Sequence, residues 1–137
     1  MAYTTEVTLV ASRTDTSNVT ASDGSAITVD IYRRATCILS VTAISGGATL
    51  DVAIQTYVNG QWTDIARFAQ ATTVSSRVLW DIGGTVGTSS TIEEAIQDLA
   101  ITVGTKRAGP WGPTIRATWT IASAGSVTWS LTGSFQS

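Results

Sequence analysis

Carboxylates are the residues of this 137-residue sequence best suited to acid–base chemistry, because the chain contains no histidine. Without histidine, Ser-His-Asp and Cys-His catalysis and most transition-metal sites are excluded. Glu93 and Glu94 are adjacent, and neighbours on a helix point about 100° apart, so they do not form a facing acid–base pair. Asp51, Asp64 and Asp81 lie in or beside predicted strands, which leaves open a glycosidase pair built from separate strands. We expect a protein that is not an enzyme and that binds neither a cofactor nor a metal.

The single cysteine, Cys37, is the other group with chemical potential. One cysteine excludes an intramolecular disulfide and a thiolate zinc cage. Its neighbours Ile38, Leu39 and Val41 are typical of a buried strand. We therefore interpret Cys37 as a small buried hydrophobic residue and not as a nucleophile.

The charge balance argues against nucleic acid as a partner. The net charge is −2 and the isoelectric point is about 4.8, whereas nucleic-acid-binding domains carry a basic surface. The only clustered cations are Arg33-Arg34 and Lys106-Arg107, which are typical of solvated loops or strand ends. No apolar run approaches the roughly 20 residues that a membrane span needs. We expect a protein that contacts neither nucleic acid nor membrane and is made in the cytoplasm.

The elements that must position these residues are predicted to be strands. The chain has 24 threonines and 15 serines, and threonine suits the outer face of a sheet. Apolar residues alternate with polar ones in most segments, most regularly from Ile115 to Ile121 and from Val127 to Phe135. Asn59-Gly60 predicts a type I′ hairpin turn, and the odd spacing of Trp62 and Ile65 predicts a bulge near Thr63-Asp64.

These patterns predict one domain over residues 1–137. Its expected architecture is an all-β, antiparallel two-sheet β-sandwich of the jelly-roll type. Two segments depart from the alternation: the polar residues Ser12 to Ser25 are interpreted as a long loop, and helical spacing with a capping box predicts one short helix near 90–99.

The five tryptophans divide into predicted core and predicted surface residues. Trp80, Trp119 and Trp129 share the parity of the aliphatic residues in their strands, which predicts burial. Trp62 follows the hairpin turn and is expected to be half-exposed. Trp111 lies between two Gly-Pro steps, and two hypotheses stay open for it: a plug over one end of the sandwich, or an anchor for a partner.

Two regions of the chain resemble a known class of protein. The runs Leu50 to Gln55 and Asn59 to Phe68, and then Ile115 to Ile121, are similar to small structural proteins encoded near bacteriophage capsid genes. The resemblance covers about two thirds of the chain from Cys37 onward, and its residues are mostly core and turn positions. The segment from Ser89 to Pro113 departs from the pattern as an insertion.

The resemblance implies a non-enzymatic virion structural protein assembled in the host cytoplasm. A head decoration (cement) protein that binds the capsid surface is the first expectation, and a head–tail or tail-associated protein is the second. The implied partner is the major capsid protein or another virion protein. Proteins of this class often form trimers at local three-fold positions, so the resemblance also implies a homotrimer.

The candidate interface residues come from the insertion and the hairpin. They are Trp111, Lys106, Arg107 and Trp62. The alternative hypothesis is a carbohydrate-binding or host-adhesion module of a virion, which needs an exposed aromatic ring against a sugar face. Its candidates are Trp62, Trp111, Tyr57 and Tyr3.

Overall fold

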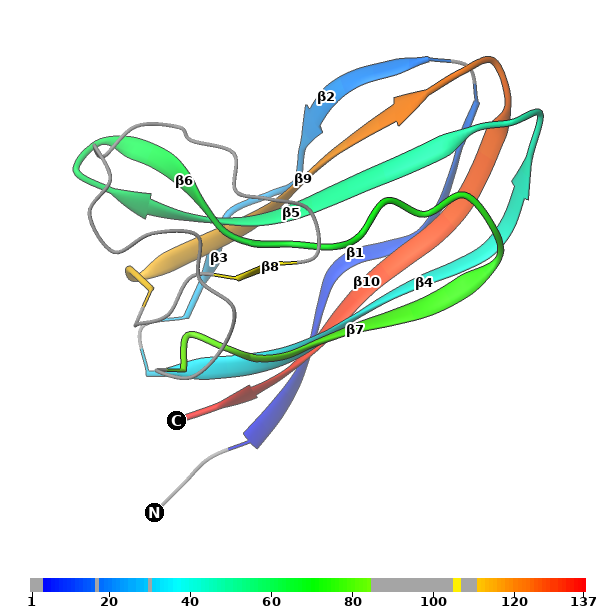
Figure 1. Cartoon of the computed structure of the whole chain (residues 1–137). Helices are drawn as coiled ribbons and strands as arrows, with labels where there is room; N and C mark the ends of the chain where they lie inside the picture. The colour runs from blue at the N-terminus through cyan, green and yellow to red at the C-terminus, as the bar shows by residue number, and fades with distance from the viewer. Residues whose placement is uncertain (1–3, 17, 30, 85–104, 107–110) are drawn as a thin grey trace.

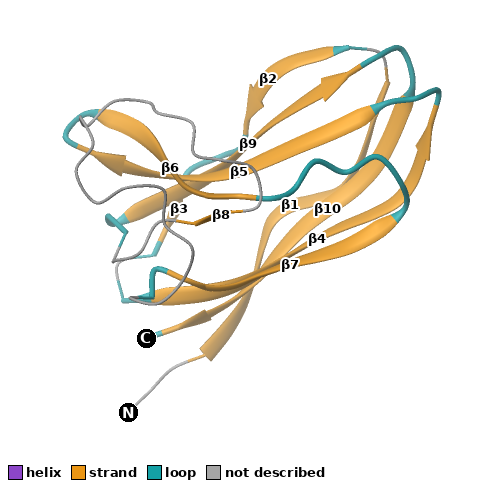
Figure 2. Cartoon of the chain, in the orientation of Figure 1, coloured by secondary structure: helices purple, strands orange, loops and turns teal. Residues whose placement is uncertain are grey.

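A computed structural model of the chain confirms the predicted all-β, antiparallel two-sheet sandwich (Figure 1 and Figure 2). The structure describes residues 4–16, 18–29, 31–84, 105–106 and 111–137. The helix expected near 90–99 lies outside these residues. The described residues form ten strands, of which β3 and β8 contain only two residues each.

The strands pair into two sheets that face each other. Sheet A has four strands in the order β1 (Thr4–Thr16), β10 (Ser126–Gln136), β4 (Arg34–Ser45) and β7 (Ser75–Ile82). Sheet B has six strands: β2 (Val19–Asp23), β9 (Thr114–Ala122), β5 (Thr49–Val58), β6 (Gln61–Arg67) and β8 (Thr105–Lys106) in that order, and β3 (Ile27–Thr28) beside β9. In Figure 1, β4, β7, β10 and β1 form the lower layer, and β5, β9 and β6 lie above them.

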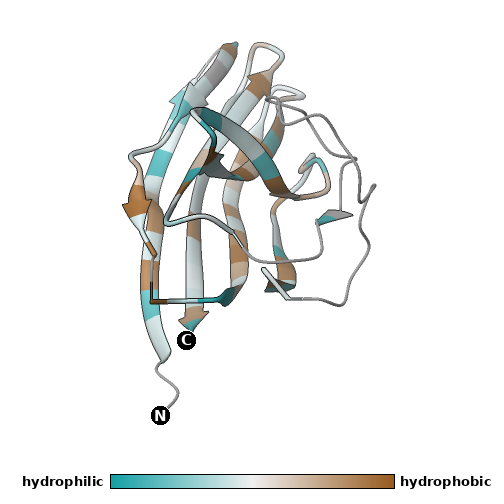
Figure 3. Cartoon of the chain, turned by 90° about the vertical axis from the view of Figure 1, so that its left-hand side faces the viewer, coloured by the Kyte–Doolittle hydropathy of each residue, from teal (hydrophilic) through white to brown (hydrophobic). Residues whose placement is uncertain are grey.

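The core fills the space between the sheets. Hydropathy alternates along the strands in Figure 3, because successive strand residues point to opposite faces. In β9 and β10 every second residue is buried, as predicted, and Trp119 and Trp129 lie in the core. Cys37 is also buried, and burial raises the pKa of its thiol to about 12, which matches a structural role.

The hairpin between β5 and β6 has the predicted turn. Asn59 and Gly60 have φ angles of 49° and 81°, and Val58 pairs with Gln61 across the turn. Both central residues therefore have the positive φ that defines a type I′ turn. The predicted bulge is also present, at Ile65: Ile54 pairs with Ala66 and Gln55 pairs with Asp64, which leaves Ile65 without a partner.

Replacing Gly60 tests this turn. Gly60→Ala forces a residue with a Cβ into the left-handed region, and no atom lies within 4 Å of that Cβ, so backbone strain is the whole effect. We expect the free energy of unfolding to fall by about 1 to 2 kcal/mol. Urea denaturation measures it, with Gln61→Ala at the exposed neighbour as a control that should stay within about 0.5 kcal/mol. An unchanged Gly60→Ala would contradict the turn.

The prediction of a loop from Ser12 to Ser25 is wrong. Strand β1 continues to Thr16, and β2 follows from Val19 to Asp23. Both lie at an edge of their sheets, where a strand needs fewer apolar residues. Register irregularities in β1 also break the alternation, so that the adjacent residues Leu9 and Val10 are both buried.

The prediction that Trp80 belongs to the core is also wrong. Trp80 is 70% exposed, although Ile82, two residues later, is buried. Asp81 between them has a φ of 53°, and the pairing of β4 with β7 shifts register between Ala35 and Cys37. This irregularity turns Ile82 into the core and leaves Trp80 on the outer face, so parity with Ile82 predicted the wrong side.

Candidate functional site

Trp111 closes one end of the sandwich. Its indole Nε1 donates a hydrogen bond to the carbonyl oxygen of Tyr32 at 3.1 Å, and its ring centroid lies 5.7 Å from that of Phe135. The following backbone N–H, of Gly112, donates to Thr56 Oγ1 at 2.8 Å. These contacts favour the plug over the anchor, since the indole is already engaged by the fold. A docking role for Trp111 stays a prediction.

The other predicted interface residues are engaged by different elements. Lys106 Nζ donates to the carbonyl oxygens of Trp80 and Asp81, at 2.7 and 2.8 Å, and so covers the end of β7. Trp62 packs against the guanidinium of Arg116, 4.3 Å from the ring centroid, and against Tyr57. Arg107, like Tyr3, lies outside the described residues. These contacts do not join Trp111, Lys106 and Trp62 into one patch.

A surface that the sequence analysis missed lies on the outer face of sheet A. Ile38 of β4 lies directly opposite Val78 of β7, and Trp80 is the next residue on the same face of β7. The three side chains are 41%, 38% and 70% exposed. We call them the β7 surface. Contiguous groups of large apolar side chains are uncommon on protein surfaces, and where they occur they often mark binding sites.

The β7 surface lies beside an edge of sheet A. Strand β7 forms one edge of sheet A, and among the described residues it is paired in that sheet with β4 alone. A charged pair belongs to the same two strands: Arg34 of β4 and Asp81 of β7 form an ion pair of 3.5 Å. An apolar centre with a polar rim is the usual anatomy of a protein–protein interface.

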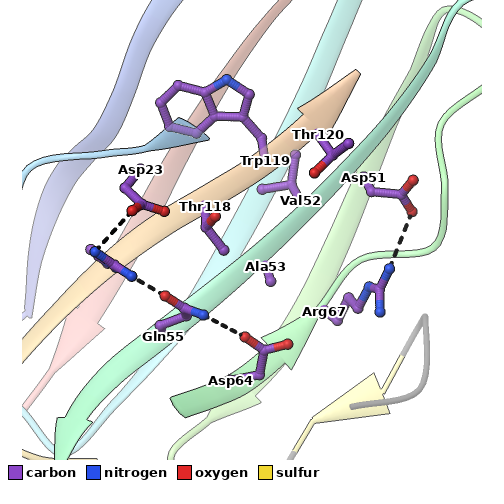
Figure 4. Close-up of a pocket in the computed structure, with 11 residues that line it drawn as sticks. Asp23, Asp51, Val52, Ala53, Gln55, Asp64, Arg67, Thr118, Trp119 and Thr120 are labelled. Atoms are coloured by element: carbon purple, nitrogen blue, oxygen red, sulfur yellow. Dashed lines mark hydrogen bonds and ion pairs between the residues drawn. The ribbon is translucent and has the colours of Figure 1, made fainter. Parts of the chain in front are cut away.

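A second candidate site is a groove on the outer face of sheet B (Figure 4), with a volume of about 380 Å³. We call it the sheet B groove. Its floor is Ala53, which lies on this face of β5 between Asp51 and Gln55. Thr118 of β9 lies opposite Ala53. The hollow arises because the side chain of Ala53 is only a methyl group, whereas Asp51 and Gln55 beside it have longer side chains.

One wall of the sheet B groove is a chain of polar contacts that crosses four strands. Arg116 Nη1 lies 3.2 Å from Asp23 Oδ2, and Arg116 Nε donates to Gln55 Oε1 at 2.9 Å. Gln55 Nε2 in turn donates to Asp64 Oδ1 at 2.9 Å. Dashed lines mark these contacts in Figure 4. Gln55 and Asp64 are each only 5% exposed, although they lie on the outer face of a sheet.

The opposite wall contains a second ion pair. Arg67 Nη2 lies 3.8 Å from Asp51 Oδ1, and Gln70 Nε2 donates to Asp51 Oδ2 at 2.9 Å. Thr120, opposite Asp51, adds a hydroxyl. Each carboxylate of the groove is therefore held by a donor, and each guanidinium has a carboxylate or an amide beside it. This arrangement fixes the polar groups before any ligand arrives.

The sequence contained only part of the signal for this groove. Asp51, Ala53 and Gln55 alternate with the apolar residues Leu50, Val52 and Ile54, a pattern that predicts the same face of one strand for all three, as the structure has them. The groove depends on which residues of β6 and β9 lie opposite them. That pairing is set by the bulge at Ile65 and by the register of β9, and neither position is visible in the pattern of a single strand.

Among the described residues, no three metal-binding side chains are placed so that they could hold a metal ion together, and no helix is long and apolar enough to cross a membrane. Comparison with known proteins adds no assignment. No protein-family model, no curated protein and no solved structure matches this chain.

Proposed function

We propose that this protein is a non-enzymatic structural component of a bacteriophage virion, a head decoration protein that binds the capsid surface through the β7 surface. The single observation that carries the proposal is the exposed Trp80 beside Val78 and Ile38. Tryptophan is among the residues that contribute most to protein–protein affinity, and an apolar centre of this kind is an efficient anchor. The sequence resemblance to virion structural proteins supports the choice of partner.

The architecture suits this role. Of the eight longest strands, the first pairs with the last, the second with the seventh, the third with the sixth and the fourth with the fifth: β1·β10, β2·β9, β4·β7 and β5·β6. A long hairpin folded over itself in this way forms two Greek keys. This pairing supports a jelly roll, a fold that presents two broad faces while its loops gather at the ends.

The proposal includes the assembly state. The partner is the major capsid protein or another virion protein, and the decoration unit is a homotrimer, as the resemblance implies. Three copies bound together add their contacts, so avidity allows a small apolar centre such as the β7 surface to hold the protein on a shell.

Replacing Trp80 tests the proposal. Trp80→Ser removes the largest exposed apolar side chain without touching the core, so the free energy of unfolding should stay within about 0.5 kcal/mol of the parent. Occupancy on particles that lack the protein should require a concentration about tenfold higher or more, the effect of losing an anchor residue. Co-sedimentation with purified particles measures the occupancy.

The matched control is Tyr57→Ser, which removes an exposed aromatic ring from the other sheet. It should leave occupancy unchanged. Equal occupancy for the parent and Trp80→Ser would show that the β7 surface is not the docking surface. The absence of this chain from purified virions would contradict the virion role itself.

A further inference from the structure

We propose that the sheet B groove is a binding site for a neutral saccharide, held by hydrogen bonds and not by ring stacking. This inference goes beyond attachment to a shell, because it assigns a ligand to the sheet opposite the β7 surface. It implies that a particle-bound copy presents a glycan-binding face. Four features of the groove lead to it: its shape, its fixed polar groups, its charge balance and the covering of the tryptophan rings in and beside it.

The shape is that of a site for a small ligand. The volume of about 380 Å³ is near the lower end of the roughly 300 to 1,000 Å³ typical of ligand sites. Ala53 forms the floor, and Asp51 and Gln55 stand on either side along β5. A ligand in the groove therefore meets polar side chains at both ends and a methyl group in the middle. One face of a sugar ring carries the same mixture of hydroxyl and C–H groups.

The polar groups are held in place in advance. Gln55 and Asp64 are nearly buried and joined by a hydrogen bond, and Arg116 fixes Gln55 from the other side. Side chains that are already ordered lose little freedom when a ligand binds. A shielded carboxylate or guanidinium also makes a stronger hydrogen bond than one in open water.

The charge balance selects the class of ligand. The groove is lined by three aspartates, Asp23, Asp51 and Asp64, and by two arginines, Arg67 and Arg116. The excess of one negative charge disfavours phosphate and other anions, while the arginines disfavour a metal ion. A hydroxyl both donates and accepts, so a molecule with several hydroxyls can use carboxylate, guanidinium, amide and threonine together. A neutral saccharide has this pattern.

The tryptophans of the groove and of its edge are not free to stack on a sugar. Trp119, which lines the groove, is only 4% exposed, and its ring packs against that of Trp129 in the core. The ring of Trp62 has the Arg116 guanidinium 4.3 Å from its centroid, and its centroid lies 5.2 Å from that of Tyr57. Trp62 therefore supports Arg116 at the edge of the groove. Recognition rests on the hydrogen-bonding groups, which distinguishes this site from the exposed-ring platform expected from the sequence.

Titration of the full-length ¹⁵N-labelled protein with a panel of neutral mono- and disaccharides, followed by NMR, tests the inference. At least one neutral sugar should shift the side-chain amide signal of Gln55 and the Nε–H signal of Arg116 in a saturable way. Inorganic phosphate, calcium and an acidic sugar are run as separate probes.

Two variants complete the test. Ala53→Gln places a long side chain on the floor and should weaken the binding of that sugar at least tenfold, whereas Gln61→Ala, at an exposed position of β6 outside the groove, should bind within twofold of the parent. Thermal melting confirms that both variants fold. Trp80→Ser should bind the sugar normally, so loss of the docking surface and loss of the groove are separable.

Three outcomes would overturn the inference. The first is that none of the neutral sugars shifts the groove signals. The second is saturable binding of phosphate, calcium or the acidic sugar in place of a neutral one. The third is that folded Ala53→Gln binds the neutral sugar as well as the parent does.

Discussion

Trp129→Ala is expected to lower the free energy of unfolding by about 3 to 5 kcal/mol, the usual range for removing a buried aromatic side chain. Trp129 is completely buried in β10, in the interior of sheet A. Its ring centroid lies 5.1 Å from that of Trp119 in an edge-to-face arrangement, so this pair fills the space between the two sheets. Alanine leaves a cavity that a close-packed core cannot fill.

Trp129→Phe separates packing from hydrogen bonding. Phenylalanine keeps most of the apolar volume but removes the indole Nε1, which donates to Asp15 Oδ2 at 3.0 Å. We expect a smaller loss of about 1 to 3 kcal/mol, from the lost hydrogen bond and the smaller ring. Chemical denaturation of both variants gives the two values. A loss below 1 kcal/mol for Trp129→Ala would mean that the ring is not part of the core.

The second large effect is expected at Asp15, as a dependence of stability on pH. Asp15 is buried near the end of β1, where it accepts hydrogen bonds from Arg13 Nε at 2.9 Å and from Trp129. Burial alone raises the pKa of this carboxyl, but the hydrogen bonds from Arg13 and Trp129 and the charge of Arg13 outweigh it. The pKa in the folded state is therefore below the ordinary value of 3.8.

The sign of the effect follows from proton binding. As the pH falls below the ordinary value, the unfolded chain takes up a proton at this carboxyl before the folded chain does. The stabilisation by ionised Asp15 is thus complete well above pH 3.8 and is lost as the pH falls through the folded-state pKa. Asp15→Asn removes the charge, and at pH 7 we expect a loss of about 1 to 3 kcal/mol.

Urea denaturation of the parent and of Asp15→Asn between pH 7 and pH 2 measures this effect. The difference between them should be largest at neutral pH and should shrink as the acid range below 3.8 is entered. Glu6→Gln, at an exposed position of the same strand, is the control and should stay within about 0.5 kcal/mol at pH 7. A difference that does not vary with pH would contradict the role of the ionised carboxylate.

The fold was predictable where strands are regular and half-buried. Strands β9 and β10 alternate without interruption, and their tryptophans went to the predicted side. Prediction failed where the backbone is irregular. At Asp81, which has a positive φ, the alternation is broken, so Trp80 is exposed and Ile82 is buried although they are two residues apart. Register irregularities in β1 likewise break the alternation there, and the polar segment was not predicted to be a strand. Strand side chains alternate between the two faces with a period of two residues. One extra residue in a bulge therefore moves the side chains that follow it to the opposite face, and the sequence pattern does not show where this happens.

The candidate sites were less predictable than the fold. The exposure of Trp80 in the β7 surface depends on the irregular backbone at Asp81. The sheet B groove depends on how four strands pair, because the pairing decides which side chains surround Ala53. Trp111, the most conspicuous candidate in the sequence, closes one end of the fold, where its indole donates a hydrogen bond to the carbonyl oxygen of Tyr32. Residues in ordinary alternation, such as Ala53 and Gln55, instead form the groove.

The position of β10 between β1 and β4 has a consequence for synthesis on the ribosome. Thr4 pairs with Gln136, so the first strand waits for a partner that is translated more than a hundred residues later. At about 5 to 20 residues per second, this delay is on the order of ten seconds. During that time the apolar sides of β1 and β4 have no strand between them and are open to nascent-chain chaperones or to other chains. The yield of soluble protein should therefore respond to translation speed and temperature more than its final stability suggests.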